Sequence, residues 1–140
     1  FDAVVCAEVV EHLDDRREAI ERLASMVAPG GHLLVTCPTG RVYETERRFG
    51  HTTHPTIDEL YAHAAALDLR VVRAVNWGFP LYRALKWATN VDADWAMKNF
   101  ASGRYSPAAK AVSHALYWAN HLNLPSSPAG CQLFVLFRRG

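Results

Sequence analysis

Two short apolar runs on either side of one amphipathic stretch limit what the first forty residues can form. The runs span residues 3–7 and 32–37, and their nearly unbroken apolar character predicts strands that are buried on both faces. Between them, residues 15–28 carry apolar side chains at helical spacing, and Asp15 with Glu18 predicts a capped start. A strand, a helix and a second strand in this order predict a right-handed β-α-β unit in an α/β fold.

The rest of the chain adds to this unit. A short helical turn is expected near residues 43–48, and Thr56 with Glu59 predicts a capping box at the start of a helix. Further apolar runs predict two strands, residues 69–75 and 131–137.

The segment between those last two strands, about residues 81–129, reads as a helical insert. Helices are expected over residues 81–89 and 107–122, the second capped by Ser106 and opened by Pro107. If the insert closes over the sheet as a lid, the last strand can return beside its neighbours in the opposite direction. We therefore expect three parallel strands and one antiparallel strand.

Composition limits the class of protein. The chain has 140 residues, half of them hydrophobic, with 15 Lys and Arg against 14 Asp and Glu. A net charge of +1 leaves no basic excess for a nucleic-acid-binding module that works by bulk charge, so no nucleic-acid partner is expected. No apolar run reaches the roughly 18 residues that a membrane-spanning helix needs. Three scattered cysteines without a CxxC pair predict free buried thiols and a cytoplasmic protein.

Three ionisable residues follow the first predicted strand and precede the first helix: Glu8, Glu11 and His12. Ligands of open α/β sheets bind outside the carboxyl ends of the strands, which is where this loop lies. A solvated loop remains the alternative interpretation, but the position favours a functional site.

These residues belong to a longer resemblance. Residues 1–13 and 29–38 closely resemble class I S-adenosylmethionine-dependent methyltransferases, over their fourth strand, the following loop and helix, the Pro29-Gly30-Gly31 turn and the fifth strand. The similarity continues in residues 50–60, as in the small-molecule branch of the family. Asp68 stands where the family usually has glycine. The resemblance implies a Rossmann-like sheet, S-adenosylmethionine as cofactor, and methyl transfer to a small molecule.

The resemblance also implies what is missing. The family binds its cofactor through a glycine-rich loop after its first strand, and no Gly-x-Gly-x-x-Gly run occurs here. We therefore expect residues 1–140 to be the C-terminal half of a methyltransferase domain, inactive by itself. A non-catalytic half-domain or interaction module is the alternative. By resemblance, Cys6, Ala7 and Glu8 contact the cofactor near its methionine end, and residues 10–12 face the reaction centre.

Two catalytic roles are considered for the loop, and the alternative is that it has neither. His12 is a candidate general base for an acceptor hydroxyl, because the pKa of imidazole lies near neutrality. Alternatively, the loop resembles the metal site of small-RNA 2′-O-methyltransferases and some quinone-pathway O-methyltransferases. That resemblance implies Mg²⁺ or Mn²⁺ held by carboxylates and imidazoles. The candidate ligands are Glu8, Glu11 and His12 together with His51 or His54, and of these two histidines we expect His54.

Two further expectations concern surfaces. The insert is rich in aromatic residues, which either roof a pocket for an apolar or aromatic acceptor or form the insert's own core: Trp87, Trp95, Phe100, Tyr105, Tyr117 and Trp118. Without a neighbour, the first strand presents an unpaired edge. We expect the isolated chain to self-associate through that edge.

Overall fold

The computed structural model describes residues 1–100 and 107–140 as one mixed sheet with helices. The strands are β1 (Ala3–Ala7), β2 (His32–Pro38), β3 (Leu69–Trp77) and β4 (Gln132–Arg139), in the order β1-β2-β4-β3. β1 and β2 are parallel, whereas β4 is antiparallel to both β2 and β3. The expected arrangement of three parallel strands and one antiparallel strand is therefore confirmed.

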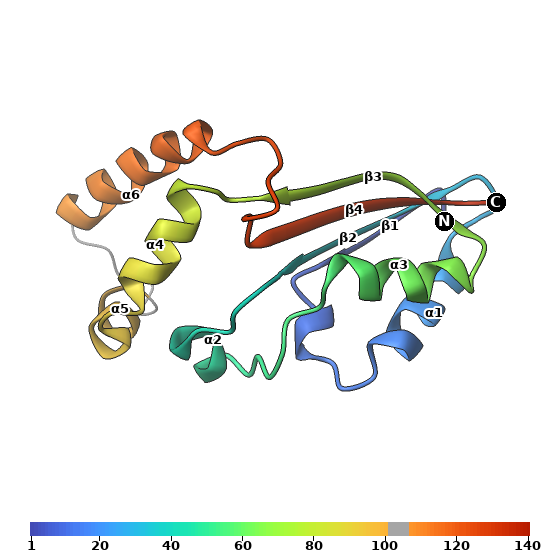
Figure 1. The fold of residues 1–140 in the computed structure, drawn as a ribbon, viewed down its shortest axis with the longest axis horizontal. Helices are drawn as coiled ribbons and strands as arrows, with labels where there is room; N and C mark the ends of the chain where they lie inside the picture. Colours follow the sequence, from blue (N-terminus) through green and yellow to red (C-terminus); the bar gives the residue numbers. More distant parts are fainter. Residues whose placement is uncertain (101–106) are drawn as a thin grey trace.

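Two helices, α1 (Arg16–Met26) and α3 (Ile57–Ala65), cover one face of the sheet (Figure 1). The Asp15 carboxylate accepts the Glu18 N–H at 2.8 Å, and Thr56 and Glu59 form the predicted capping box.

The hydrophobic core lies between the sheet and these helices. The largest of its side chains are Leu33, Val35, Leu133, Val135 and Phe137, together with Ile20 and Leu60 from the helices. The prediction that residues 3–7 are buried on both faces is wrong, because Cys6 is buried on the helix-covered side whereas Val5, on the other face of β1, is 63% exposed.

In the turn before β3, Asp68 stands where the family usually has glycine, and its backbone conformation explains why glycine is usual there. Asp68 has φ +53°, in the left-handed region that favours glycine. Aspartate tolerates this region better than most residues do, so the same turn forms with an aspartate.

The described part of the insert includes the helices α4 (Leu81–Thr89), α5 (Ala93–Phe100) and α6 (Pro107–Ala119). They lie beyond the end of β3, away from both chain termini (Figure 1). α4 matches its expected bounds, α5 was not expected, and the last turn of the expected second helix is a separate 3₁₀ helix, Asn120–Leu122. The proposed cap Ser106 lies outside the described residues. Within the described part of the chain, no helix is long and apolar enough to cross a membrane.

The insert is fastened to α2 (Glu44–Arg48), the short helix that follows β2. Lys86 of α4 forms an ion pair with Glu46 at 2.6 Å, and both side chains are largely buried. Arg48 pairs with Asp94 of α5 at 2.6 Å. These contacts hold the insert against the chain segment that leads into the candidate site.

Candidate active site

The candidate site lies where β1 and β2 end. β1 runs into Glu8, and a 3₁₀ helix, Val10–His12, then leads toward α1. At the end of the neighbouring strand, the chain passes through α2 into residues 50–55, which come back beside the 3₁₀ helix. The two segments together contribute two carboxylates and three imidazoles to one region.

Glu8 adopts a conformation that directs its side chain toward the neighbouring strands. Its φ is +54°, uncommon for a residue with a side chain, and its N–H donates to the Thr36 carbonyl at 2.9 Å. The Thr36 hydroxyl donates to Glu8 Oε1 at 2.9 Å, and the Gln132 amide donates to the same oxygen at 2.5 Å. Residues of β1, β2 and β4 therefore meet at this carboxylate.

Glu11 is the least exposed charged residue of the site. Only 1% of it is exposed, and neither carboxylate oxygen has a hydrogen-bond partner among the described residues. Burial raises the pKa of this carboxyl, and the nearby Glu8 charge raises it further, against the opposing effects of Glu11's own backbone N–H, His12 and Arg16. A buried acid without a partner is costly, so this one is suited to a cationic ligand.

Three imidazoles lie in a row beside it. The rings of His12 and His51 meet edge to face, 4.5 Å between centroids, and His51 Nδ1 lies 3.0 Å from His54 Nε2. His12 is exposed, whereas the His54 side chain is fully buried. Burial lowers the pKa of both His51 and His54, which favours their neutral forms.

Two sets of side chains are close enough to hold a metal ion, with ligand atoms within 4.8 Å of one another. One set is Glu11, His12 and His51, and the other is Glu46, His51 and His54. The Glu46 carboxylate is already compensated, because Lys86 donates to it at 2.6 Å and the Tyr43 N–H donates to it at 2.8 Å. In the part of the chain that the structure describes, the Glu11 carboxylate of the first set has no hydrogen-bond partner, so this set is the better candidate for holding a cation.

This arrangement differs from the four-residue set given by the resemblance. Glu11 and His12 are brought together, and the third ligand within reach is His51, the alternative to the expected His54. Neither Glu8 nor His54 belongs to the set that contains Glu11. Glu8 is held by Thr36 and Gln132, and His54 points into the buried side near Glu46.

Arg16 connects the segments that form the site. Its guanidinium donates to the Val10 carbonyl at 3.1 Å, to the Thr53 carbonyl at 2.7 Å and to the Thr53 hydroxyl at 2.6 Å. It also pairs with Glu59 at 3.2 Å. One side chain thus fixes the 3₁₀ helix, residues 50–55 and α3 relative to one another.

The other residues expected at the cofactor, Cys6 and Ala7, lie at the carboxyl end of β1, with Cys6 buried and Ala7 exposed. All three cysteines are free and buried. Burial raises the pKa of the Cys6 thiol, and it raises that of Cys37 to about 12. These thiols are unsuited to act as nucleophiles.

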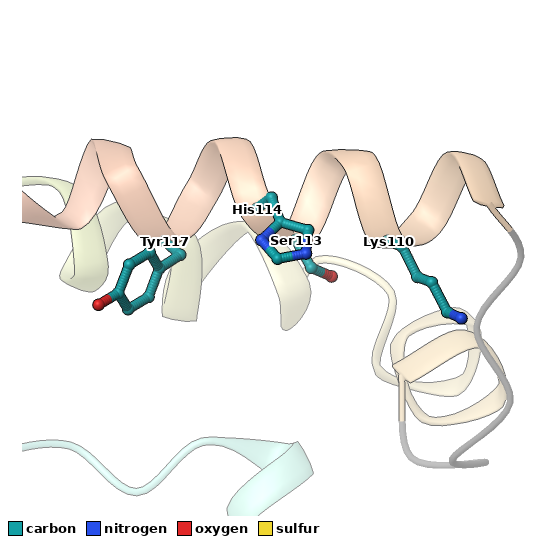
Figure 2. A pocket seen from close by; sticks show the side chains of 4 residues that line it. All are labelled: Lys110, Ser113, His114 and Tyr117. Carbon is teal, nitrogen blue, oxygen red and sulfur yellow. The ribbon is translucent and has the colours of Figure 1, made fainter.

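The insert contains a cavity of its own, of about 470 Å³, along α6. Its lining side chains project to the same side of the helix (Figure 2): Lys110, Ser113, His114 and Tyr117. Trp87 and Trp118 are 63% and 68% exposed, so they do not form a closed core within the insert. Tyr105 and the side chain of Phe100 lie outside the described residues.

A comparison with protein families identifies the chain. A family described as a methyltransferase domain matches residues 1–100. The chain belongs to this methyltransferase-domain family. Its mixed sheet with an antiparallel strand beside β2 agrees with that membership.

Among proteins similar to this methyltransferase-family chain, the ubiquinone biosynthesis O-methyltransferase of Alkalilimnicola ehrlichii (strain ATCC BAA-1101 / DSM 17681 / MLHE-1) is 47% identical over 34 residues. That alignment covers 24% of this chain and 14% of the relative. Phosphoethanolamine N-methyltransferase 2 of Haemonchus contortus, solved with S-adenosyl-L-methionine, has a TM-score of 0.51 at 15% identity, over 99% of this chain and 33% of that one.

The cyclase SpnF has a TM-score of 0.55 at 18% identity, over 99% of this chain and 49% of that one. The present chain thus spans about half or less of the length of each of these three proteins. A cyclase among the neighbours also illustrates that the fold alone does not fix the reaction.

Three site residues escaped the sequence analysis: Arg16, Thr36 and Gln132. Arg16 follows a helix cap and resembles an ordinary surface arginine. Thr36 and Gln132 had a weak signal, because each is a polar residue within a predicted buried strand. A polar side chain in a buried strand needs a hydrogen-bond partner. For both Thr36 and Gln132 that partner is the Glu8 carboxylate.

Proposed function

We propose that the protein to which this chain belongs transfers a methyl group from S-adenosylmethionine to a small-molecule acceptor. The observation that carries the proposal is the cluster of Glu8, Glu11 and His12 at the carboxyl end of β1 in a chain of the methyltransferase-domain family. The cofactor bound to the Haemonchus contortus neighbour supports the choice of S-adenosylmethionine. When bound, this cofactor supplies an electrophilic methyl group on a positively charged sulfur.

The chain's part of the cofactor site is proposed to be Cys6, Ala7 and Glu8. Cys6 is buried, so it can contact the cofactor only through its backbone atoms or by packing. Glu8 is exposed and can contact the cofactor with its carboxylate. No ion pair to Glu8 occurs within residues 1–100 and 107–140 at up to 4.0 Å. Its negative charge is therefore available to a cationic part of the cofactor.

His12 is the proposed general base. Its imidazole is exposed at the site, and its ring meets the His51 ring edge to face. A neutral imidazole can accept the proton that the acceptor loses as the new bond to the methyl group forms. The remaining contribution of the chain is to position the reactants for an in-line displacement.

A metal-assisted O-methyl transfer is the second candidate, and one observation favours it: the buried, unpartnered carboxylate of Glu11. With His12 and His51 within reach, it forms a one-carboxylate, two-imidazole site. Of the two ions expected from the resemblance, Mn²⁺ suits imidazole ligands better than Mg²⁺ does. A metal at this site would lower the pKa of an acceptor hydroxyl.

An apolar or aromatic acceptor is proposed because the insert exposes Trp87 and Trp118 beside the cavity-bearing helix α6. The relative named for ubiquinone biosynthesis supports such a substrate. We also propose a cytoplasmic location, on the three free buried thiols. The 140-residue chain by itself is proposed to be inactive, and a purely non-catalytic module remains the alternative.

The cofactor proposal is tested by titrating S-adenosylhomocysteine into the full-length protein in a calorimeter. Saturable binding is expected, and its weakening is expected in the Glu8→Gln variant. An absence of heat at millimolar ligand would refute the proposed function and favour the non-catalytic module.

The two roles of His12 are separated by a metal titration. If a metal is used, Mn²⁺ added to chelator-treated protein should raise its melting temperature, and His51→Gln should abolish the rise. His114→Gln on α6 is the matched control, because it removes an imidazole outside the site. If Mn²⁺ leaves the melting temperature unchanged, the metal-assisted alternative is refuted.

A further inference from the structure

The Glu8 carboxylate is held by one of its two oxygens only. Both the Thr36 hydroxyl, at 2.9 Å, and the Gln132 amide, at 2.5 Å, donate to Oε1. Among the hydrogen bonds of the described residues, none engages Oε2. The side chain is therefore anchored on one side and open on the other.

The two donors are themselves part of the sheet. Thr36 is 8% exposed and lies in β2, and Gln132 is 9% exposed and is the first residue of β4. They lie on the face opposite α1 and α3, because their neighbours Val35, Cys37 and Leu133 point into the core that those helices cover. Donors built into two paired strands hold an acceptor more rigidly than donors on a loop do.

Neutral donors orient a carboxylate without neutralising it. Hydroxyl and amide dipoles stabilise the ionised form, but the negative charge stays unpaired, since no ion pair to Glu8 is found in the described parts of the chain. Oε2 consequently keeps its share of the carboxylate charge available to a ligand. A primary ammonium, with three donors and a positive charge, is a matching partner for one carboxylate oxygen.

We propose that Thr36 and Gln132 are positioning residues that anchor Glu8 Oε1 so that Oε2 binds the α-ammonium of the cofactor's methionine arm. This inference rests on the proposed function, because it assumes that S-adenosylmethionine binds at this edge. It assigns a role to a residue of β4, 124 positions from Glu8 in the sequence. It also joins the cofactor site to the strand by which the insert returns to the sheet.

The test compares ligands that keep the amine of this arm with one that lacks it. The full-length protein and two variants, Thr36→Val and Gln132→Met, are titrated with S-adenosylhomocysteine, decarboxylated S-adenosylmethionine and 5′-methylthioadenosine. Thr36→Val removes a buried hydroxyl at nearly constant volume, so it preserves the test if Gln132→Met fails to fold. Thr89→Val is the matched control, because the Thr89 hydroxyl donates to Leu85 within α4.

Each anchoring variant should bind S-adenosylhomocysteine and decarboxylated S-adenosylmethionine, which both keep the amine, about tenfold more weakly. Binding of methylthioadenosine, which lacks the amine, should not change, and Thr89→Val should match the wild type for all three ligands. Equal losses for all three ligands, or no loss for any, would overturn the inference while leaving the proposed function intact. Failure of the wild type to bind S-adenosylhomocysteine would overturn both.

Discussion

Arg16 offers the sharpest stability test of how the site is assembled. Its side chain is only 12% exposed, and its guanidinium donates to Val10, to two oxygens of Thr53 and to Glu59. Replacing it by methionine keeps most of the aliphatic stem but removes every donor. The carbonyls of Val10 and Thr53 would then lose a partner, while Glu59, 32% exposed, can be hydrated.

The expected cost follows from these contacts. Three hydrogen bonds to neutral acceptors contribute about 1 kcal/mol each, and a partly exposed ion pair adds less than about 1 kcal/mol. Because such terms are not fully additive, Arg16→Met should lower the free energy of unfolding by about 2–4 kcal/mol. For a chain of this size that lowers the melting temperature by roughly 6–12 °C.

The neighbouring arginine provides the control. Arg17 is 69% exposed, and among residues 1–100 and 107–140 its side chain bonds only to Glu21, one turn away on the same helix. Arg17→Met should therefore cost at most about 0.5 kcal/mol. Thermal unfolding followed by circular dichroism measures both variants. Equal losses in the two would refute the view that Arg16 ties the site segments together.

Three further predictions follow from the buried groups and the sheet edge. Folding raises the pKa of Glu11, so its ionisation should destabilise the folded state as the pH rises above the ordinary carboxyl pKa. The free energy of unfolding of the chelator-treated wild type should therefore fall relative to that of Glu11→Gln between about pH 4 and 8. If urea unfolding gives the same pH dependence for both proteins, the prediction is refuted. The three cysteines should not react with a disulfide reagent in the native protein and should all react in guanidinium, whereas a fast native reaction would show an accessible thiol. The isolated 140-residue chain should self-associate through the edge of β1, and a monodisperse monomer in light scattering would exclude this.

Local sequence patterns were enough to place most of the elements. The Thr56 capping box depends on residues three apart, so the sequence shows it directly. The same holds for Asp15 and for the bounds of α4. The direction of β4 followed from the family resemblance together with the need to return from the insert.

Contacts between segments far apart in the sequence could not be predicted from local patterns. The bond from Gln132 to Glu8 depends on the register of β4 against β2 and on the left-handed φ of Glu8, neither of which has a local signature. The choice of His51 over His54 beside Glu11 is of the same kind. It depends on how Arg16 holds Thr53 and on how Gly50, with φ +90°, turns the chain before His51.

The most direct test of the account is a crystal structure of the full-length protein with S-adenosylhomocysteine bound. The account predicts the α-ammonium within about 3.2 Å of the Glu8 carboxylate, with the sulfur facing His12. A ligand bound without contact to residues 6–8, for example in the cavity along α6, would contradict it.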